Sequence, residues 1–477
     1  MKFIIPIFLL AFLSISFIFS GCSQENEFAT DPIESLHFSA DTLSFDTVFS
    51  TVGTPTAWLK IYNTGNKNIR ISGVSLKEGG KGFRLNLDGE SKQTFTDLDI
   101  LAKDSLFLFV ELIPAEKGTD KPFKINDAII FQTEGKQKQI VLEAYSQDVV
   151  IWHGKTITSD TFLSSNKPYL IYDSLVVAEN AKLTIQEGAT FYFHDAAKVV
   201  VHGSLKAIGT AMAPITFRGD RLDDVLPDLP YEYYPGQWGS VRFTASSYDN
   251  EFDYVHIRGA NYGLIADASS TDRSKLKMTN SIIHNMTSNC ILSYNSKMSV
   301  ANSQITNSGS NSLCLIGGEY DFTHCTIANY QRLISRNGAT LLVSNILPVT
   351  DGKSILYPLK SNFYNCIVFG NQTSEIDTLR SGGASWELLF KNCMLRSKEW
   401  SSNMATNCIY PSEAKFLKLG FDEDKYKIDF RLDSLSEARN HADPAYSISY
   451  PYDMNGVSRL TDGIPDIGAY EWIPGQK

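Results

Sequence analysis

The densest group of polar and aromatic side chains in the sequence lies between residues 218 and 240. Carboxylates can accept hydrogen bonds from hydroxyl groups, and aromatic rings offer flat apolar faces, so this mixture suits the binding of a sugar. The candidate residues are Asp223, Asp224, Asp228, Tyr231, Glu232, Tyr233, Tyr234 and Trp238. The same rings could instead pack against a hydrophobic surface, and the sequence leaves both interpretations open.

Catalysis by this segment is harder to support. Glycoside hydrolysis needs two carboxylates at a defined separation, and neighbouring acidic residues in a loop set no such separation. The histidines are scattered along the chain, and His256, His284 and His324 are expected to be structural. No catalytic residue is therefore assigned. Non-catalytic binding is the favoured function, with a polysaccharide lyase, a glycoside hydrolase or a structural envelope protein as alternatives.

Metal binding has one weak candidate near the C-terminus. Asp453, Asn455 and Asp466 carry oxygen ligands at short spacing, which would suit calcium. The loop pattern of an EF-hand is absent, so the favoured interpretation is that Arg459 pairs with a carboxylate while the segment covers the last coil of the preceding domain. No cofactor is expected. No pair of cysteines has the spacing of a zinc site.

A repeat in residues 151–430 predicts the element that carries the 218–240 loop. Short stretches with period-2 alternation end in Asn285, Asn307 and Asn329, which are 22 residues apart. This spacing indicates the coils of a parallel β-solenoid, because helical repeats are longer and have a 3.6-residue period. Equivalent residues of stacked coils form columns, so the three asparagines are predicted to form a structural amide ladder.

The cysteines follow the same period. Four of them fall in the small-residue position of the repeat and two in another strand set; they are Cys325, Cys366, Cys393, Cys408, Cys290 and Cys314. Because their spacing follows the coils and not a clustered disulfide framework, we expect free, buried thiols.

Residues 34–150 predict a separate β-sandwich. Seven short apolar runs are separated by turn signals, among them Asn63-Thr64-Gly65-Asn66, and no helix-period stretch competes with them. Residues 431–477 are predicted to form a C-terminal cap segment. The expected fold class is therefore all-β, with a sandwich followed by a parallel solenoid and a cap.

The first 21 residues read as an export signal. One charge, Lys2, precedes a long apolar run, which is the order of a signal peptide. Residues 22–33 form a short polar linker. The net charge of −10 argues against a nucleic-acid partner, because phosphate binding depends on lysine and arginine.

Several segments resemble known families. The tail Phe19-Ser20-Gly21-Cys22 resembles the bacterial lipobox, which implies 1–21 as a lipoprotein signal peptide and Cys22 as the lipidated residue. The acidic residues 23–27 look like the signal that sends Bacteroidetes lipoproteins to the cell surface. The resemblance implies a lipid anchor in the outer membrane, surface exposure, and contact with polysaccharide or other surface proteins.

The domains carry resemblances of their own. Residues 34–150 resemble immunoglobulin-like domains of the abnormal-spindle/hydin kind, through the runs 45–49, 58–65 and 143–148. Residues 181–217 are similar to the opening coils of bacterial pectin-lyase-like proteins, which implies a right-handed parallel β-helix. Residues 453–459 and 465–471 resemble the closing segment of choice-of-anchor Q proteins. The catalytic motifs of polygalacturonases are not found in their usual order, which favours glycan or partner binding.

Overall fold

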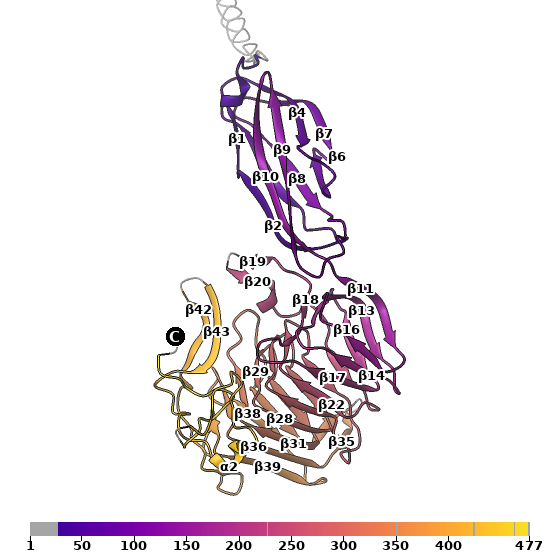
Figure 1. Ribbon diagram of the computed structural model, residues 1–477. Coiled ribbons are helices and arrows are strands. Elements are labelled where there is room, and N and C mark those ends of the chain that lie inside the picture. Colours follow the sequence, from indigo (N-terminus) through magenta and orange to yellow (C-terminus); the bar gives the residue numbers. More distant parts are fainter. Residues whose placement is uncertain (1–26, 227, 350–351, 423–424, 462, 476–477) are drawn as a thin grey trace, which may run out of the picture. The chain divides into compact units, whose positions relative to one another are not determined.

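The computed structural model describes residues 27–226, 228–349, 352–422, 425–461 and 463–475, and the chain divides into two compact units (Figure 1). The first unit ends at Gln147 and the second begins at Asp148. The predicted signal peptide and Cys22 lie outside the described residues. Helix is confined, within the described ranges, to α2 (Pro444–Ser447) and the short 3₁₀ turns η1 (Pro32–Glu34) and η2 (Tyr231–Tyr233). None of these helices is long and apolar enough to cross a membrane.

The first unit consists of two five-stranded sheets. In spatial order, the strands of one sheet are β1 (Leu36–Phe38), β3 (Ala57–Asn63), β8 (Ser105–Leu112), β5 (Phe83–Leu87) and β6 (Glu90–Lys92). Those of the other are β2 (Thr42–Phe49), β10 (Lys136–Gln147), β9 (Phe123–Thr133), β4 (Ile69–Leu76) and β7 (Thr94–Ile100). All pairings are antiparallel except that of β10 with β2.

Alternation builds the core of this unit. Leu59 and Ile61 of β3 are fully buried, and they join Leu108 and Val110 of β8 in one hydrophobic cluster with residues of the second sheet. Residues between them in the sequence take the opposite face, as the two-residue period of a strand requires. The seven predicted strands are all present, and the two sheets share one core.

The second unit is a parallel β-helix with three strand ladders, each running along the coils. The first ladder contains β12 (Thr161–Leu163), β14 (Lys182–Ile185), β17 (Ser204–Ile208), β22 (Asn250–Asp253), β25 (Leu276–Thr279), β28 (Lys297–Ala301), β31 (Gly318–Thr323), β36 (Leu359–Tyr364), β39 (Trp386–Lys391) and β41 (Ala405–Thr406). The second contains β15 (Thr190–Phe193), β18 (Ile215–Gly219), β23 (Val255–Arg258), β26 (Ile282–Met286), β29 (Gln304–Ser308), β32 (Thr326–Asn329), β37 (Ile367–Gly370) and β40 (Met394–Leu395). The third contains β16 (Lys198–Val201), β21 (Val241–Phe243), β24 (Leu264–Ala266), β27 (Ile291–Tyr294), β30 (Leu313–Ile316), β33 (Leu341–Ser344) and β38 (Ile376–Leu379). The long strands β11 (Val150–Ile157) and β13 (Tyr169–Val177) start both the second and the third ladder.

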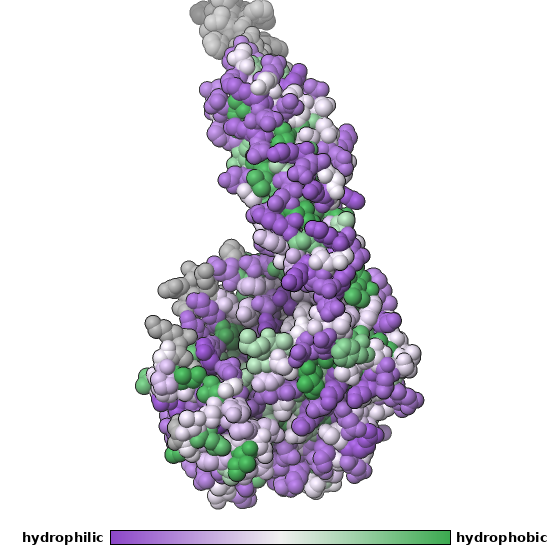
Figure 2. All heavy atoms as spheres, viewed as in Figure 1, coloured by the Kyte–Doolittle hydropathy of each residue, from purple (hydrophilic) through white to green (hydrophobic). Residues whose placement is uncertain are grey.

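Stacked aromatic rings mark the regular spacing of the coils. The ring centroids of Phe191 and Phe217 are 5.1 Å apart. The ring centroid of Phe363 lies 4.9 Å from that of Phe322 and 4.9 Å from that of Phe390. These separations are close to the distance between neighbouring strands, so identical side chains of successive coils pack on one another inside the helix. Figure 2 shows that the face in view is mostly hydrophilic, with hydrophobic residues in small separate groups.

The cysteines occupy the interior as predicted. All six that the structure describes are free, and five are buried. Backbone N–H groups of Cys325 and Cys366 each donate to the sulfur of the next cysteine in the column, Cys366 and Cys393, at 3.4 Å. Cys290 and Cys314 do not share a position, because Cys314 pairs with Leu292.

The C-terminal segment lies against the side of the β-helix. The sequence analysis predicts instead that it covers the last coil. The ladders end at β41, and β42 (Phe416–Asp422) and β43 (Lys425–Leu432) form an antiparallel hairpin, so the coils end before the predicted residue 430. Phe430, Ile467 and Ala469 pack on Ile367 and other outward residues of the second ladder. This ladder has an apolar outer face in its later coils, and that face needs cover.

Candidate functional site

The outer face of the second ladder changes character along the helix. In the early coils, one outward column contains Tyr192, Arg218, Arg258 and His284, because the parallel pairing aligns Tyr192 with Arg218 and Arg258 with His284. His256 stands two residues before Arg258 in the neighbouring column. In later coils the same face is apolar and carries the C-terminal segment. Functional groups therefore gather where the ladder is polar.

The 218–240 loop lies over this polar region. It leaves β18, forms the small antiparallel pair β19 (Asp224–Leu226) and β20 (Leu229–Pro230), passes through η2, and returns at β21. Its backbone crosses the corner after β23. There Gly259 has φ +66, and a Cβ at this position would lie 3.0 Å from the carbonyl oxygen of Tyr234. The glycine lets the loop approach the coil closely and place Glu232 between two arginines.

Glu232 is shared by Arg218 and Arg258. One carboxylate oxygen accepts from Nη1 of Arg258 at 2.7 Å and from Nη1 of Arg218 at 3.2 Å. The three side chains are between 15% and 23% exposed. Two guanidinium groups and one carboxylate leave one positive charge in excess in a half-buried setting. We refer to Arg218, Glu232, His256, Arg258 and His284 as the arginine–histidine cluster.

Both histidines of the cluster are neutral at pH 7. Burial, followed by the charge of Arg258, lowers the pKa of His256 to about 4 and that of His284 well below its usual value of 6.5. Nη2 of Arg258 lies 3.3 Å from Nδ1 of His256. A guanidinium can only donate, so Nδ1 accepts and the proton of His256 is on Nε2.

Several buried atoms of this region lack a hydrogen-bond partner among the described residues. They are both ring nitrogens of His284, both amide atoms of Asn285 and Nε of Arg258. His284 is 7% exposed and Asn285 is fully buried. Buried polar atoms without partners cost about 1–3 kcal/mol each, so native proteins keep few of them away from water or a ligand. The cluster therefore offers unused donors and acceptors beside an excess positive charge.

Tyrosine rings border the cluster. The ring of Tyr233 lies 6.1 Å from that of His284, edge to face, and 5.7 Å from the ring of Tyr426. The guanidinium of Arg218 lies over the ring of Tyr192, 5.7 Å from the centroid of that ring. Burial raises the pKa of both Tyr192 and Tyr233, so their phenols stay protonated at neutral pH. The border supplies flat apolar faces next to charged and polar groups.

The structure separates the eight candidate residues of the loop. Glu232 belongs to the cluster, Tyr233 borders it, and Tyr234 contributes a backbone oxygen over Gly259. Trp238 is fully buried, its ring lies 4.3 Å from that of Phe193, and its Nε1 donates to the carbonyl of Arg258 at 2.8 Å. Its assignment as a ligand-binding residue is therefore wrong, because the ring fills the core of the coil.

The other four loop residues lie in or beside the β19–β20 pair. Asp223 forms an ion pair with Arg221, whose guanidinium is 4.2 Å from the ring centroid of Tyr231. Asp224 and Asp228 are exposed. Arg221, Asp223 and Tyr231 contact one another in a small group.

The predicted asparagine ladder is present as a column but not as a chain of amide bonds. Asn285, Asn307 and Asn329 are buried. Each directly follows a strand residue that pairs with its equivalent in the next coil, so the three asparagines occupy the same position of successive coils. Asn329 donates to the carbonyl of Ser308, and Asn307 accepts from the backbone of Tyr330. An amide-to-amide bond occurs instead in the preceding corner, where Nδ2 of Asn302 donates to Oδ1 of Asn280 at 3.1 Å.

That preceding corner requires a left-handed backbone. Asn280, Asn302, Asn365, Asn392 and Asn407 all have φ between 48 and 53. Asparagine tolerates this conformation better than most residues, which explains its repetition at this position of the coil.

The two aspartates among the calcium candidates near the C-terminus accept hydrogen bonds from backbone N–H groups. Oδ1 of Asp453 accepts from the backbone of Asn455 and Val457, and Asp466 accepts from Asn440 and Trp472. The described part of the chain contains no group of three or more histidine, cysteine or acidic residues that could hold a metal ion. Arg459 pairs with Glu471 at 2.5 Å, as the favoured interpretation of the sequence predicts.

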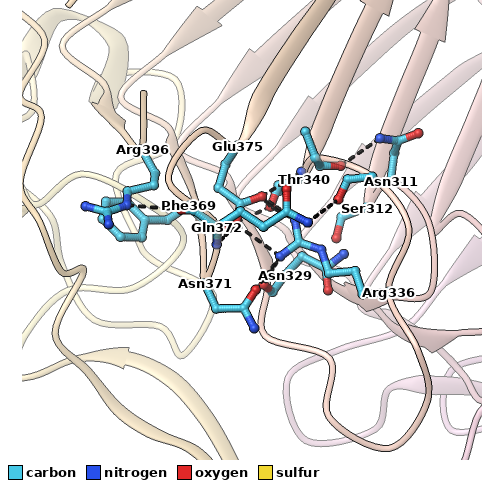
Figure 3. Close-up of polar contacts among 12 residues, drawn as sticks. Asn311, Ser312, Asn329, Arg336, Thr340, Phe369, Asn371, Gln372, Glu375 and Arg396 are labelled. Carbon is cyan, nitrogen blue, oxygen red and sulfur yellow. Dashed lines mark hydrogen bonds and ion pairs between the residues drawn. The ribbon is translucent and has the colours of Figure 1, made fainter. Parts of the chain in front are cut away.

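A second arginine–carboxylate pair lies deeper in the molecule (Figure 3). Glu375 is fully buried and pairs with Arg336; it also accepts from the backbone of Thr340 and Gln372 at 2.9 and 2.7 Å and from the hydroxyl of Thr340 at 2.8 Å. Arg336 donates further to Asn371 and to the carbonyl of Asn329. We call this group the Arg336 network. It ties the 330–340 loop to the next coil.

Comparison with known proteins identifies no family for this chain. No family model matches the chain, and no curated protein matches it. Among solved structures, a family 123 glycoside hydrolase from Clostridium perfringens, described in a structural analysis of glycolipid glycan hydrolysis, matches with 10% identity and a TM-score of 0.16. The match covers 24% of this chain and 26% of that enzyme, so the likeness spans about a quarter of each. A similarity of this size supports no statement about activity.

Proposed function

We propose that the chain is a lipid-anchored envelope protein whose β-helix binds, without cleaving, a glycan that carries carboxylate or sulfate groups. One observation carries the binding proposal: two arginines share a single carboxylate beside buried polar atoms of His284 that have no partner among the described residues. An anionic group would balance the excess charge, and sugar hydroxyls would satisfy the imidazole nitrogens. Tyr192 and Tyr233 would flank the sugar ring.

The location belongs to the same proposal. The resemblance of residues 19–22 to a lipobox supports lipidation at Cys22, and the acidic residues after it support exposure on the outer membrane. The first unit would then be an immunoglobulin-like module between the anchor and the β-helix. Labelling of growing cells with a radioactive fatty acid tests the anchor, because the label must disappear in Cys22→Ser.

Binding is tested with the chain lacking residues 1–21, run in native gels that contain chondroitin sulfate, alginate or polygalacturonate, with dextran as the neutral control. We expect retardation by at least one acidic polysaccharide, weakened by added salt. Arg218→Gln/Arg258→Gln should abolish the retardation, whereas Arg242→Gln, which removes an exposed arginine paired with Asp267 elsewhere on the β-helix, should not. Equal migration in all gels would contradict the proposal.

A polysaccharide lyase is the second candidate, favoured by a specific feature. A neutral imidazole beside two arginines could remove a proton next to a carboxylate that the arginines neutralise. The same acidic polysaccharides serve as the test. Ultraviolet absorbance from an unsaturated product, lost in His256→Asn or His284→Asn, would replace binding by catalysis as the function.

A further inference from the structure

The outer face of the β1-β3-β8-β5-β6 sheet exposes large aromatic rings. Trp58 is 54%, Phe107 45% and Phe109 39% exposed. In β8 the sequence from Leu106 to Val110 is continuously apolar, a pattern typical of strands covered on both faces. Here only one face is covered, since Leu108 and Val110 are buried while the two phenylalanines meet solvent. Such an uncovered apolar group marks a binding surface more often than a monomer's ordinary exterior.

The rings form one continuous strip across two strands. The antiparallel register places Trp58 opposite Phe109 and Lys60 opposite Phe107. The ring centroids of Phe107 and Phe109 are 6.3 Å apart with planes 20° from parallel, and Trp58 meets Phe107 edge to face at 5.7 Å. Nζ of Lys60 lies 5.4 Å from the Phe107 ring. The strip therefore combines aromatic faces with one cation at its margin.

A polar recess of about 210 Å³ adjoins this strip. Its lining includes Phe109 and the side chains of Arg84, Asn86, Ser91 and Glu111. Arg84 supplies donors, Glu111 acceptors, and Asn86 and Ser91 both. Arg84 and Glu111 face each other in register, so their charges balance. The surface thus has flat apolar faces beside a small recess, whose hydrogen-bonding groups are mixed and balanced in charge. It matches a molecule that is apolar on one side and rich in hydroxyls at its edges.

We propose that Trp58, Phe107, Phe109 and the adjoining recess form a second glycan-binding site, which takes an uncharged polysaccharide chain. Its C–H faces would stack on the rings and its hydroxyls would enter the recess. Three rings and a recess of about 210 Å³ make a small site, whereas a stable protein interface takes roughly 800 Å² per partner, which favours a slender chain over a protein. The site goes beyond the proposed function and is independent of it, because the arginine–histidine cluster lies in the other unit.

The test uses the chain lacking residues 1–21 in native gels that contain hydroxyethylcellulose, xylan or galactomannan. We expect retardation by at least one of these neutral polymers. Trp58→Ala/Phe107→Ala should weaken the binding by at least about tenfold, since aromatic residues dominate such contacts. Phe162→Ala, which removes another exposed ring (63%) in β12, is the matched control and should migrate as the wild type does. Unchanged thermal melting of the variants shows that loss of binding is not loss of folding.

Three outcomes would overturn this site: no retardation in any of the neutral gels, equal retardation of the Trp58→Ala/Phe107→Ala variant, or sedimentation with phosphatidylethanolamine/phosphatidylglycerol vesicles that needs the rings while the polysaccharides have no effect. The two sites fail separately. Arg218→Gln/Arg258→Gln should keep its retardation by the neutral polymer, and Trp58→Ala/Phe107→Ala should keep its retardation by the acidic one.

Discussion

Two arginine–carboxylate groups on the same β-helix differ in how completely their hydrogen bonds are satisfied. In the Arg336 network, Glu375 is fully buried and accepts from an arginine, two backbone N–H groups and a hydroxyl. In the arginine–histidine cluster, Glu232 accepts from two arginines and from no other residue that the structure describes, and it remains 23% exposed. Arg336 Nε is the only atom of the Arg336–Glu375 pair reported without a partner, within the described residues, whereas the cluster leaves Arg258 Nε and both nitrogens of His284 without one.

On this difference we base the proposal of a structural role for the Arg336 network and a binding role for the arginine–histidine cluster. A buried ion pair whose carboxylate has a full set of partners holds a loop in place, and that carboxylate is not available to a ligand. A half-buried group with spare donors, spare acceptors and an unbalanced charge has a cost in the free protein that a ligand can remove. The presence of an arginine–carboxylate pair therefore does not by itself distinguish a structural from a binding role. The hydrogen-bond partners of the pair must also be known.

The largest expected effect is on the stability of the Arg336 network. Glu375→Gln leaves the guanidinium of Arg336 buried without its counter-charge, so we expect a loss of about 3–5 kcal/mol in the free energy of unfolding. Urea denaturation followed by tryptophan fluorescence measures it. Retardation by acidic polysaccharides should persist in the folded fraction. A loss below about 1 kcal/mol would show that this network is not the structural member of the comparison.

The reverse pattern is expected for the arginine–histidine cluster. Arg258→Gln removes one of two charged donors, so affinity for the retained acidic polysaccharide should fall by about 10- to 100-fold, equivalent to about 1.4–2.8 kcal/mol. Stability should change by less than about 1 kcal/mol, because Glu232 keeps Arg218 and the group is partly solvated. Titration calorimetry and urea denaturation of the same variant give both numbers. A variant that loses stability but keeps affinity would reverse the assignment.

Sequence analysis predicts the fold better than the site, and particular residues show why. The seven predicted strands of the first unit exist because alternation is a local property, while β1, β6 and β7 were missed because they are short or polar on most positions. The coil repeat is visible for the same local reason. Arg258 and His284, however, are 26 residues apart and meet only through strand register.

The loop residues illustrate the remaining errors. Trp238 looks identical in sequence to a ligand-contacting aromatic residue, yet it fills the core behind Arg258. Arg218 is absent from the candidate residues of the sequence analysis, although it follows the inward Phe217 at an outward strand position. A search for charged residues at outward positions of aligned coils could have found the arginine column.

Acid should destabilise the β-helix unit through the cluster histidines. The folded-state pKa of His256 is lowered to about 4 from 6.5, so the unfolded chain binds more protons between these values. The stability is complete above about pH 6.5 and is lost as the pH falls toward 4. This histidine alone should cost about 2 kcal/mol at pH 5. Urea denaturation at pH 7 and pH 5 measures the loss, and His256→Asn should reduce it; an unchanged pH dependence in the variant would contradict the assignment.

The smallest effect is expected at the β19–β20 pair. Asp224→Asn changes an exposed carboxylate whose charge is screened by solvent, so affinity for the acidic polysaccharide should change by less than about twofold. Native-gel retardation of this variant beside Arg258→Gln makes the comparison directly. A large loss in Asp224→Asn would extend the site from the cluster to the tip of the loop.

The most direct measurement follows the imidazole nitrogens of His284 by nuclear magnetic resonance, in protein labelled with ¹⁵N at histidine. The account predicts that adding fragments of the retained acidic polysaccharide shifts the His284 resonances, that Arg258→Gln weakens this response, and that Glu375→Gln leaves it intact in the folded protein. Binding that leaves the His284 resonances unmoved would contradict the claim that a ligand completes the arginine–histidine cluster.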